Sequence, residues 1–366
     1  MRKMKRLFVG TVAALLAAVL ILPCTVFGIS AQKAILMDAQ TGRVLFEKDA
    51  DRQSLIASTT KIMTALIVCE QCNVLDRMRI PKEAVGIEGS SMYLREGEVL
   101  TIQELLYGLM LSSGNDAAVA LAIYCGGTVE GFVQLMNDKA HRLGLRNTHF
   151  ENPNGLDSPN HYSTARDLAA LSAYAMENPI FRQTVSTKNV RAGNRSLQNH
   201  NKLLWRVEGA DGVKTGFTKA AGRVLVSSAY RQGRRLVCVT INDGNDWRDH
   251  ETLLENGFSD FQIYSIVTEG QCLGTVSILG GQSDQVQLLA AESFSFPLRD
   301  DEKTTLVLSG PGFAYAPVVQ GKQAGFAYVL LGEKTVGKVS LIYGQTVEQE
   351  TVDPPSFWER LFGGRK

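Results

Sequence analysis

Three short motifs along the chain contain residue types that together can carry out acyl transfer through a serine nucleophile. They are Ser58-Thr59-Thr60-Lys61, Ser113-Gly114-Asn115 and Lys214-Thr215-Gly216, in this order. A reactive hydroxyl, an amine that takes up its proton, a second hydroxyl and a cation that attracts a carboxylate are the groups that such a reaction needs. The set predicts a serine acyl-transferase whose base is lysine rather than histidine.

None of the motifs is informative by itself. The Ser-x-x-Lys spacing also occurs at Ser30–Lys33, and the Ser-x-Asn spacing recurs at Ser158–Asn160. Serine and lysine are abundant residues, so an isolated pair is expected by chance on a solvated surface. The prediction rests on the presence of all three motifs, each at a structural position that the chemistry needs.

The local sequence pattern predicts those positions. Apolar residues follow helical spacing after Ala57, so Ser58 is expected in the first turn of a helix. Lys61 lies three residues further on and hence on the same helical face. The second motif falls at a break between two apolar helices, where side chains can point into a cleft. The third motif is expected on a strand just before a hairpin.

Length and composition exclude several classes of protein. The chain has 366 residues, 45% of them hydrophobic and 20% charged, which is enough for two or three globular domains. A net charge of +1 gives no indication of a nucleic-acid partner. The sequence has no phosphate-binding glycine loop, and its histidines lack metal-ligand spacing, so neither a metal nor an organic cofactor is predicted.

The N-terminal residues predict export. A basic leader precedes the apolar run Leu7–Pro23, and small residues follow, so we predict a signal peptide over residues 1–30 with cleavage after Gly28 or near Ala31. An uncleaved anchor is the alternative, and either way the remaining chain lies outside the cytoplasmic membrane. Cys24 follows a proline rather than a small residue, so lipidation is not predicted.

The cysteines leave an open question in an exported protein, where thiols tend to pair. Five remain beyond Cys24, an odd number: Cys69, Cys72, Cys125, Cys238 and Cys272. The Cys69–Cys72 spacing is that of a redox motif, but it falls at the end of a predicted helix. Packing within that helix is therefore the favoured interpretation.

The predicted elements indicate an α+β catalytic domain over residues 31–262 and an all-β domain over residues 263–351. In the first part, helical patterns alternate with short strands, and a capping box at Thr101–Glu104 and a cap at Thr164 begin two of the helices. In the second part, short Val, Leu and Phe runs alternate with turns. The tail, residues 352–366, combines aromatic and basic residues, so it predicts either a membrane-surface segment or a frayed end.

The region from Ala34 to about Phe261 resembles the serine D-Ala-D-Ala carboxypeptidases, which are the low-molecular-weight penicillin-binding proteins. The likeness extends beyond the three motifs to residues 36–45, 61–64, 108–117, 136–144, 148–150, 155–157 and 162–167. It implies a fold like that of β-lactamases and transpeptidases, an antiparallel sheet with a helical cluster. The β-rich part is similar to a domain that many members carry. Ile56 replaces a usual proline, and Phe217 stands where His or Tyr is also common.

The resemblance, together with the chemistry of the residues, implies a role for each group. Ser58 is the expected nucleophile and Lys61 its general base, while Ser113 passes a proton to the leaving amine. Asn115 is expected to hold Lys61 and the substrate amide. Lys214 is expected to lower the pKa of Lys61 and, with Thr215 and Gly216 of the same motif, to bind the terminal carboxylate. The backbone N–H groups of Ser58 and Phe217 are expected to hold the oxyanion. Asn154, Asp157 and Arg248 are candidates for shaping the cleft, although structural roles are favoured for each.

The implied function is removal of the terminal D-Ala from peptidoglycan stem pentapeptides through an acyl-enzyme on Ser58. β-Lactams are expected to acylate the same serine, at the outer face of the cytoplasmic membrane or in the cell wall. Three alternatives stay open: a DD-endopeptidase, a β-lactamase and a non-catalytic penicillin-binding scaffold. A β-lactamase is disfavoured because Glu151 and Asp157 do not stand in the Glu-x-x-Leu-Asn pattern of class A enzymes.

Overall fold

The computed structural model describes residues 28–351, so the predicted tail and nearly all of the predicted signal peptide lie outside the described residues. The chain forms two compact units. Phe46–Leu253 and the chain up to Leu36 make the first, and Met37–Leu45 and the chain from Leu254 make the second. Among the described helices, none is by itself long and apolar enough to cross a membrane, although one pair bent by 83° meets that test of length and composition together.

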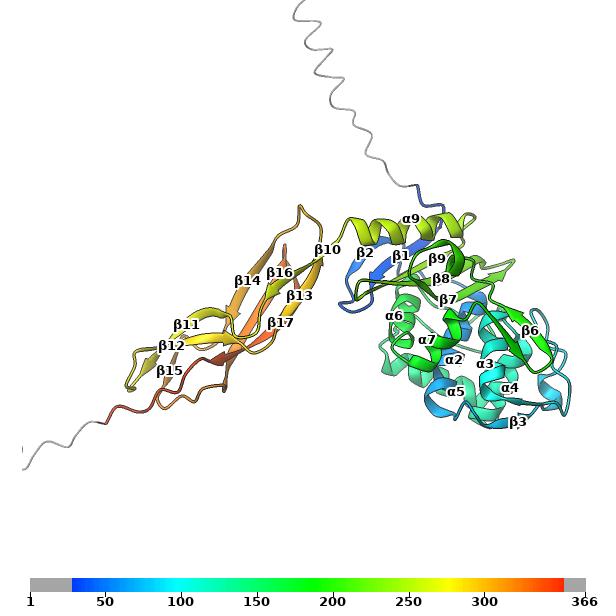
Figure 1. Ribbon diagram of the computed structural model, residues 1–366, viewed down its shortest axis with the longest axis horizontal. Coiled ribbons are helices and arrows are strands. Elements are labelled where there is room, and N and C mark those ends of the chain that lie inside the picture. Colours follow the sequence, from blue (N-terminus) through cyan, green and yellow to red (C-terminus); the bar gives the residue numbers. More distant parts are fainter. Residues whose placement is uncertain (1–27, 352–366) are drawn as a thin grey trace, which may run out of the picture. The chain divides into compact units, whose positions relative to one another are not determined.

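A five-stranded sheet with the order β2-β1-β9-β8-β7 is the centre of the first unit. Its strands are β1 (Lys33–Asp38), β2 (Val44–Lys48), β7 (Ala210–Thr218), β8 (Gly222–Arg231) and β9 (Arg234–Ile241). The last three form an antiparallel meander, as predicted. Strands β8 and β9 are buried on both faces, because α9 (Asp246–Ser259) covers one face and a group of helices the other (Figure 1).

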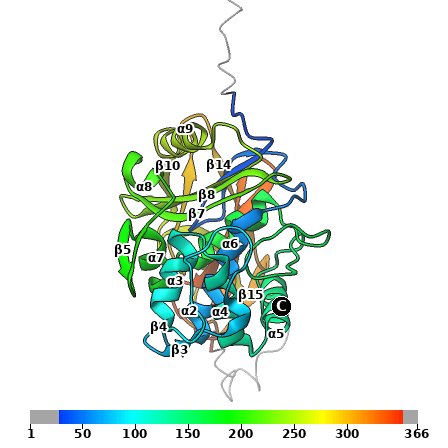
Figure 2. The same cartoon turned by 90° about the vertical axis from the view of Figure 1, so that its right-hand side faces the viewer.

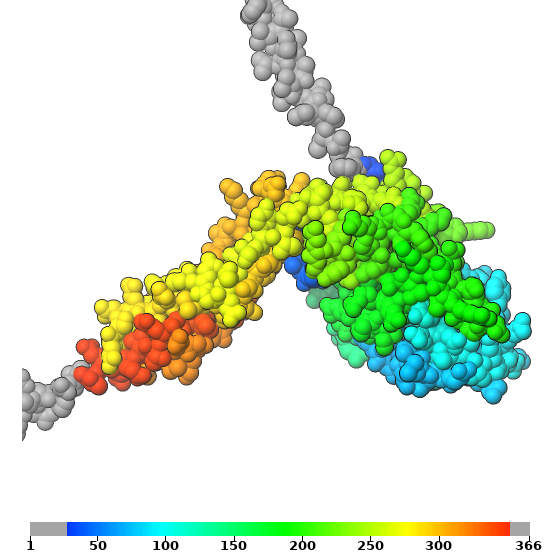
Figure 3. Space-filling model, viewed as in Figure 1, coloured from blue at the N-terminus to red at the C-terminus, as the bar shows by residue number. Residues whose placement is uncertain are grey.

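The helical group lies against one face of the sheet, as Figure 2 shows most clearly. It contains the 3-10 turn η1 (Ala57–Thr60), α2 (Lys61–Gln71), α3 (Ile102–Leu111), α4 (Asn115–Gly126), α5 (Val129–Arg142), α6 (Ala165–Ala175), α7 (Pro179–Ser186) and α8 (Leu203–Arg206). Helix α2 is buried from Lys61 to Cys69 because other helices surround it. In Figure 3 the cyan segments with α3 and α4 and the green segments with α6 to β8 form one body.

Short elements connect these helices. They are η2 (Lys82–Ala84) and two small hairpins, β3 (Arg77–Arg79) with β4 (Val99–Thr101) and β5 (Asn189–Ala192) with β6 (Arg195–Gln198). The predicted helix starts are confirmed. Thr101 and Glu104 form a reciprocal capping box, and the Thr164 side chain accepts a hydrogen bond from the Asp167 N–H at 3.1 Å. Such caps satisfy backbone donors that the first helical turn leaves without partners.

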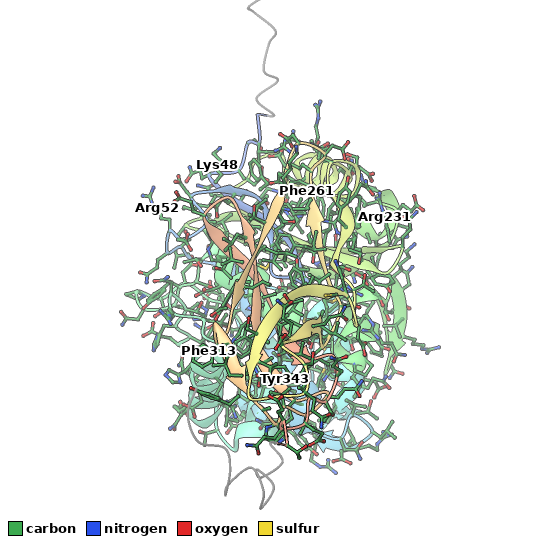
Figure 4. All side chains as sticks on the ribbon, turned by 90° about the vertical axis from the view of Figure 1, so that its left-hand side faces the viewer. Lys48, Arg52, Arg231, Phe261, Phe313 and Tyr343 are labelled. Carbon is green, nitrogen blue, oxygen red and sulfur yellow. The ribbon has the colours of Figure 1, made fainter. Side chains whose placement is uncertain are left out.

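The described chain from Gln262 onward is all-β, as the sequence predicts. Its main sheet has the order β14-β16-β17-β12-β11-β15, and β10 pairs with β13 beside it. The strands are β10 (Gln262–Val267), β11 (Cys272–Leu279), β12 (Gln285–Ala290), β13 (Phe294–Leu298), β14 (Thr304–Ser309), β15 (Phe313–Tyr315), β16 (Gln323–Leu331) and β17 (Lys334–Tyr343). Alternate residues such as Val276, Ile278 and Leu341 fill its core. Figure 4 labels Phe313 and Tyr343 on this sheet.

A buried histidine joins α9 to the sheet of the first unit. The two ring nitrogens of His250 lie 2.6 Å from the Ser227 Oγ and 3.0 Å from the Thr240 Oγ1. Burial lowers the pKa of His250 to about 3, and burial likewise lowers the pKa of His161 to about 4. The folded protein therefore keeps both imidazoles neutral under mildly acidic conditions.

Acid should consequently weaken the fold through these histidines. As the pH falls below about 6.5, His250 becomes protonated in the unfolded chain but stays neutral in the native protein. The free energy of unfolding therefore drops by about 1.4 kcal/mol per pH unit. We expect His250→Gln to remove this share of the pH dependence between about pH 6.5 and pH 4. Urea unfolding at a series of pH values measures it, with the exposed His141→Gln as the matched control. An unchanged slope in His250→Gln would contradict the expectation.

Candidate active site

The turn that carries Ser58 is held in shape by close packing. The structure corrects one detail of the prediction, because Ser58 lies in the 3-10 turn η1 and the α-helix begins only at Lys61. Ala57 adopts a left-handed φ of +47°. A Cβ on Gly155 would lie 2.0 Å from the Ala57 carbonyl oxygen. Only glycine therefore allows the loop that contains Gly155 to support the turn from behind.

The Lys61 amine is at the centre of the site. Its Nζ lies 2.9 Å from the Ser58 Oγ, 2.6 Å from the Asn115 Oδ1 and 2.6 Å from the Asn154 carbonyl oxygen. The Asn115 amide cannot turn over freely, because its Nδ2 donates to the Glu88 carbonyl at 2.5 Å. The Lys61 side chain is fully buried. Two fixed acceptors and one hydroxyl thus define the position of the amine.

The charge state of Lys61 follows from this environment. Burial lowers its pKa well below the usual value of a lysine, and the charge of Lys214 lowers it further, while Asp116 opposes the shift. Lys214 is also buried, and desolvation alone lowers its pKa to about 7. Two amines in one desolvated site cannot both keep their charge cheaply. The site therefore favours a neutral Lys61 beside a Lys214 that titrates near neutrality.

The second motif forms a tight turn between α3 and α4. Ser113 has a φ of +60°, a backbone conformation that non-glycine residues rarely adopt. Two backbone hydrogen bonds stabilise the turn, from Gly114 to Gly108 at 3.0 Å and from Asn115 to Ser90 at 2.7 Å. The turn directs the Asn115 amide at Lys61, and the Ser113 residue lines the cavity in front of Ser58.

Buried Asp116, the next residue, holds the segment that crosses in front of α4. Its carboxylate accepts hydrogen bonds from the Ser91 Oγ and from the backbone N–H groups of Met92 and Leu94 at 2.6–3.0 Å. The same segment supplies the Glu88 carbonyl that orients Asn115. Asp116 thus acts on the site through the backbone that it positions.

Strand β7 brings the third motif beside the nucleophile. A Cβ on Gly216 would lie 3.1 Å from the Ser58 N and 3.2 Å from the Ile56 carbonyl oxygen. The absence of a side chain lets the strand and η1 approach each other. Lys214 donates to the Thr215 carbonyl at 2.8 Å, whereas Phe217 is 66% exposed at the rim.

The polar loop over residues 145–163 belongs to the site, although the sequence favours structural roles for Asn154 and Asp157. Besides the Asn154 carbonyl at Lys61, the Pro153 carbonyl accepts from the Thr64 Oγ1 at 2.7 Å, and the His161 Nε2 lies 2.7 Å from the Thr60 Oγ1. The structural roles expected of Asp157 and Arg248 fit their places. Asp157 accepts from the Thr218 Oγ1 at 3.0 Å, and Arg248 lies exposed on α9.

A cavity of about 450 Å³ opens in front of Ser58. It brings together Ser58, Ser113, Thr215, Gly216 and Phe217, and its wall also contains Ser90, His200, Arg223, Val224, Asp246 and Trp247. Lys61 and Lys214 lie beneath it, buried. Sequence reasoning missed the added wall residues because none stands in a motif. Within residues 28–351, no group of three or more His, Cys, Asp or Glu side chains is arranged to hold a metal ion.

The fold and the site together indicate a serine hydrolase, and comparison with known proteins gives the family. The family described as D-alanyl-D-alanine carboxypeptidase matches residues 23–245, and the domain described as "Penicillin-binding protein 5, C-terminal domain" matches residues 261–349. The chain therefore belongs to the D-alanyl-D-alanine carboxypeptidase family and is a serine hydrolase of that class.

Similar proteins support this assignment over most of the chain. D-alanyl-D-alanine carboxypeptidase DacF of Bacillus subtilis is 31% identical, with 81% of this chain and 80% of the relative covered. DacC of Escherichia coli is 33% identical, with 88% and 85% covered. Penicillin-binding protein 5 from Haemophilus influenzae superposes with a TM-score of 0.76 at 29% identity, covering 88% of this chain and 98% of the other. The predicted family and fold class are confirmed.

The titration of Lys214 predicts how substrate affinity depends on pH. A charged Lys214 attracts a substrate carboxylate, so KM should be low below its pKa of about 7 and should rise several-fold between about pH 7 and pH 9 as that charge is lost. In Lys214→Gln we expect a KM that is high and does not rise further with pH. Steady-state release of D-Ala from a D-Ala-D-Ala peptide, followed at a series of pH values, measures KM for the wild type and for Lys214→Gln. A KM that rises equally in the two proteins would assign the titration to another group.

Proposed function

We propose that this protein removes the terminal D-Ala of peptidoglycan stem pentapeptides through an acyl-enzyme on Ser58. The observation that carries the proposal is the placement of the buried Lys61 amine 2.9 Å from the Ser58 Oγ. A serine hydroxyl is a weak nucleophile until a base takes its proton. A neutral amine at hydrogen-bond distance is such a base, and burial together with the charge of Lys214 lowers the pKa of Lys61 toward that form.

The hydrogen-bond pattern supports this direction of proton transfer. A neutral amine has two N–H donors and one lone pair. The Asn115 Oδ1 and the Asn154 carbonyl can only accept, so they take both donors. The lone pair is then left for the Ser58 hydroxyl, which donates its proton to Lys61 as it attacks the peptide carbonyl. The two acceptors thus orient the base as well as hold it.

The remaining groups complete the proposed cycle. The backbone N–H groups of Ser58 and Phe217 are the proposed oxyanion hole, and the close approach at Gly216 keeps the two segments together. Ser113 is the proposed relay that passes the proton to the departing D-Ala amine. Thr215 and the charge of Lys214 would hold the terminal carboxylate of the substrate. Water then releases the acyl group by the reverse sequence of proton transfers.

β-Lactams present a reactive amide and a carboxylate in the same arrangement, so we propose that they acylate Ser58 as well. A DD-endopeptidase remains the second candidate, because a cross-link is also an amide on a D-Ala carbonyl and the cavity is open to solvent. A β-lactamase is disfavoured by the position of Glu151, whose carboxylate accepts from the Asn160 N–H at 3.2 Å and from the Ser158 hydroxyl. That loop contact leaves Glu151 engaged away from Ser58.

Acylation of Ser58 can be tested by mass. We expect penicillin to add one covalent adduct to the wild type and none to Ser58→Ala, with D-Ala release lower by roughly 10⁴-fold or more. Ser113→Ala should acylate more slowly by about 10²-fold or more, since it lacks the proton relay. Ser158→Ala, which removes the serine of the other Ser-x-Asn sequence, is the matched control. An adduct on Ser58→Ala, or D-Ala release without Ser58, would overturn the proposal.

We further propose that the enzyme acts on the cell-wall side of the cytoplasmic membrane. The substrate is polymerised there, and the basic and apolar order of residues 1–30 is that of an export signal. Residues 352–366 contain Phe357, Trp358 and Phe362 together with Arg360, Arg365 and Lys366. Aromatic and basic residues in one short segment favour contact with an anionic membrane surface.

Removing the tail tests the membrane contact separately from catalysis. A chain that ends at Thr351 should no longer sediment with vesicles of phosphatidylglycerol and phosphatidylethanolamine, while D-Ala release from a soluble peptide should stay unchanged. Trp358→Ala should weaken sedimentation in part, because the interfacial aromatic contributes to the binding. Equal sedimentation of the full and shortened chains would remove the tail from the proposal.

A further inference from the structure

Two of the catalytic groups stand at the starts of two neighbouring helices whose far ends each carry a cysteine. Lys61 is the first residue of α2 and Asn115 the first of α4, and the two helices pack together. Cys72 directly follows α2, and Cys125 lies in the last turn of α4. The helices are 11 and 12 residues long, so the two thiols lie about 16 Å from the catalytic ends.

Hydrogen bonds on both sides of Cys72 bring these ends together. The Cys125 Sγ lies 3.7 Å from the Gln71 Oε1, and the Tyr124 hydroxyl donates to the Asp76 carboxylate at 2.9 Å. Residues 71–76 therefore lie along the last turn of α4. Cys72 lies between these two contacts, and its interaction with Cys125 raises the pKa of the Cys72 thiol and lowers that of Cys125. Both residues are only half-buried, so an oxidant can reach them.

We propose that Cys72 and Cys125 form a disulfide that ties together the far ends of the two helices bearing Lys61 and Asn115. The oxidant is a small-molecule or protein disulfide, for which oxidised glutathione serves as the probe. The inference rests on the proposed location outside the cytoplasm, because disulfides persist in oxidising compartments.

The reaction balances in two exchange steps. The Cys125 thiolate attacks one sulfur of oxidised glutathione, which forms a mixed disulfide and releases one glutathione thiolate. The Cys72 thiol then loses its proton and attacks the Cys125 sulfur, which forms the Cys72–Cys125 bond and releases the second glutathione. The protein loses two electrons and two protons, and the oxidised glutathione becomes two reduced molecules. The interaction with Cys72 lowers the pKa of Cys125, so Cys125 is the thiol that attacks first.

The third cysteine of this region is placed less favourably. Cys69 lies inside α2 and is 7% exposed, and burial raises the pKa of its thiol to about 12. It is therefore mostly protonated and shielded from an oxidant. Cys72 has left the helix, with φ −112° and ψ 146°, and it lies between Gln71 and Asp76, which contact Cys125 and Tyr124. The structure thus favours Cys72–Cys125 over a bond within the Cys69-x-x-Cys72 sequence.

Peptide mapping of the oxidised full chain identifies the bond. After equilibration with oxidised and reduced glutathione and alkylation of free thiols, trypsin should yield Ile62–Arg77 linked to Glu96–Lys139, and the link should vanish on reduction. Cys72→Ser and Cys125→Ser should each abolish it. Cys69→Ser and the exposed Cys272→Ser in the other unit are the controls and should retain it. Full alkylation of Cys72 and Cys125, or a link that depends on Cys69, would overturn the proposal.

Thermal unfolding supplies a second readout. A bond that closes a loop of this length should raise the Tm of the oxidised wild type by roughly 5 °C or more over the reduced protein. Cys72→Ser and Cys125→Ser should unfold like the reduced wild type and should not respond to reductant; a response in either variant would contradict the assignment. The penicillin adduct on Ser58 is measured on the same samples. If the Cys72–Cys125 disulfide forms but penicillin does not add to Ser58, only the proposed function is wrong. If penicillin adds to Ser58 but the disulfide does not form, only the proposed disulfide is wrong.

Discussion

The site depends on the burial of two amines, Lys61 and Lys214, within one small region. Withdrawing an ammonium from water is costly, and a second positive charge nearby increases the cost. Burial and the charge of Lys214 lower the pKa of Lys61, and the Asn115 amide and the Asn154 carbonyl give its amine fixed acceptors. Both effects favour the neutral form of the amine, which is the form that can take up a proton.

The second constraint on the site is the close approach of two backbone segments to the turn that carries Ser58. Strand β7 and the polar loop both contact η1 at distances that a side chain would prevent, at Gly216 and at Gly155. The nucleophile is therefore enclosed from two sides by main chain. Main-chain groups have no rotamers to lose, so the surfaces around Ser58 are fixed without a further cost in side-chain entropy. A reacting centre built this way is preorganised before substrate arrives.

Much of this arrangement was predictable from the sequence, for reasons that lie in local chemistry. Ser58 and Lys61 are three residues apart at a helix start, and helical geometry brings them together in any fold. The capping box at Thr101 and the meander after Lys214 are likewise local signals. The placement of Ser113 in the cavity with Ser58, and of Asn115 beside Lys61, could be expected only from the family resemblance, because it depends on how distant helices pack.

Other parts of the site left no signal in the sequence. Asn154 contributes a backbone carbonyl, which every residue type possesses, so its identity says nothing about its contact. Asp116 acts through the loop that it holds, and Trp247 and Arg223 reach the cavity from elements far apart in the chain. The sequence pattern did not predict the 3-10 form of the Ser58 turn either. β7 and the polar loop pack closely against this turn, and such tertiary contacts are not encoded in the local propensity of its residues.

The position of β7 has a consequence for what the enzyme can distinguish. In the described part of the chain, β7 ends the sheet, pairs with β8 on one side only and contacts the nucleophile turn. An extended peptide that lies along such an edge is held by its own amides and carbonyls. Those groups are the same in every peptide and convey no information about side chains. An edge strand can distinguish the direction of the bound peptide and the handedness of each of its α-carbons. Both properties matter for a polymer that ends in D-residues.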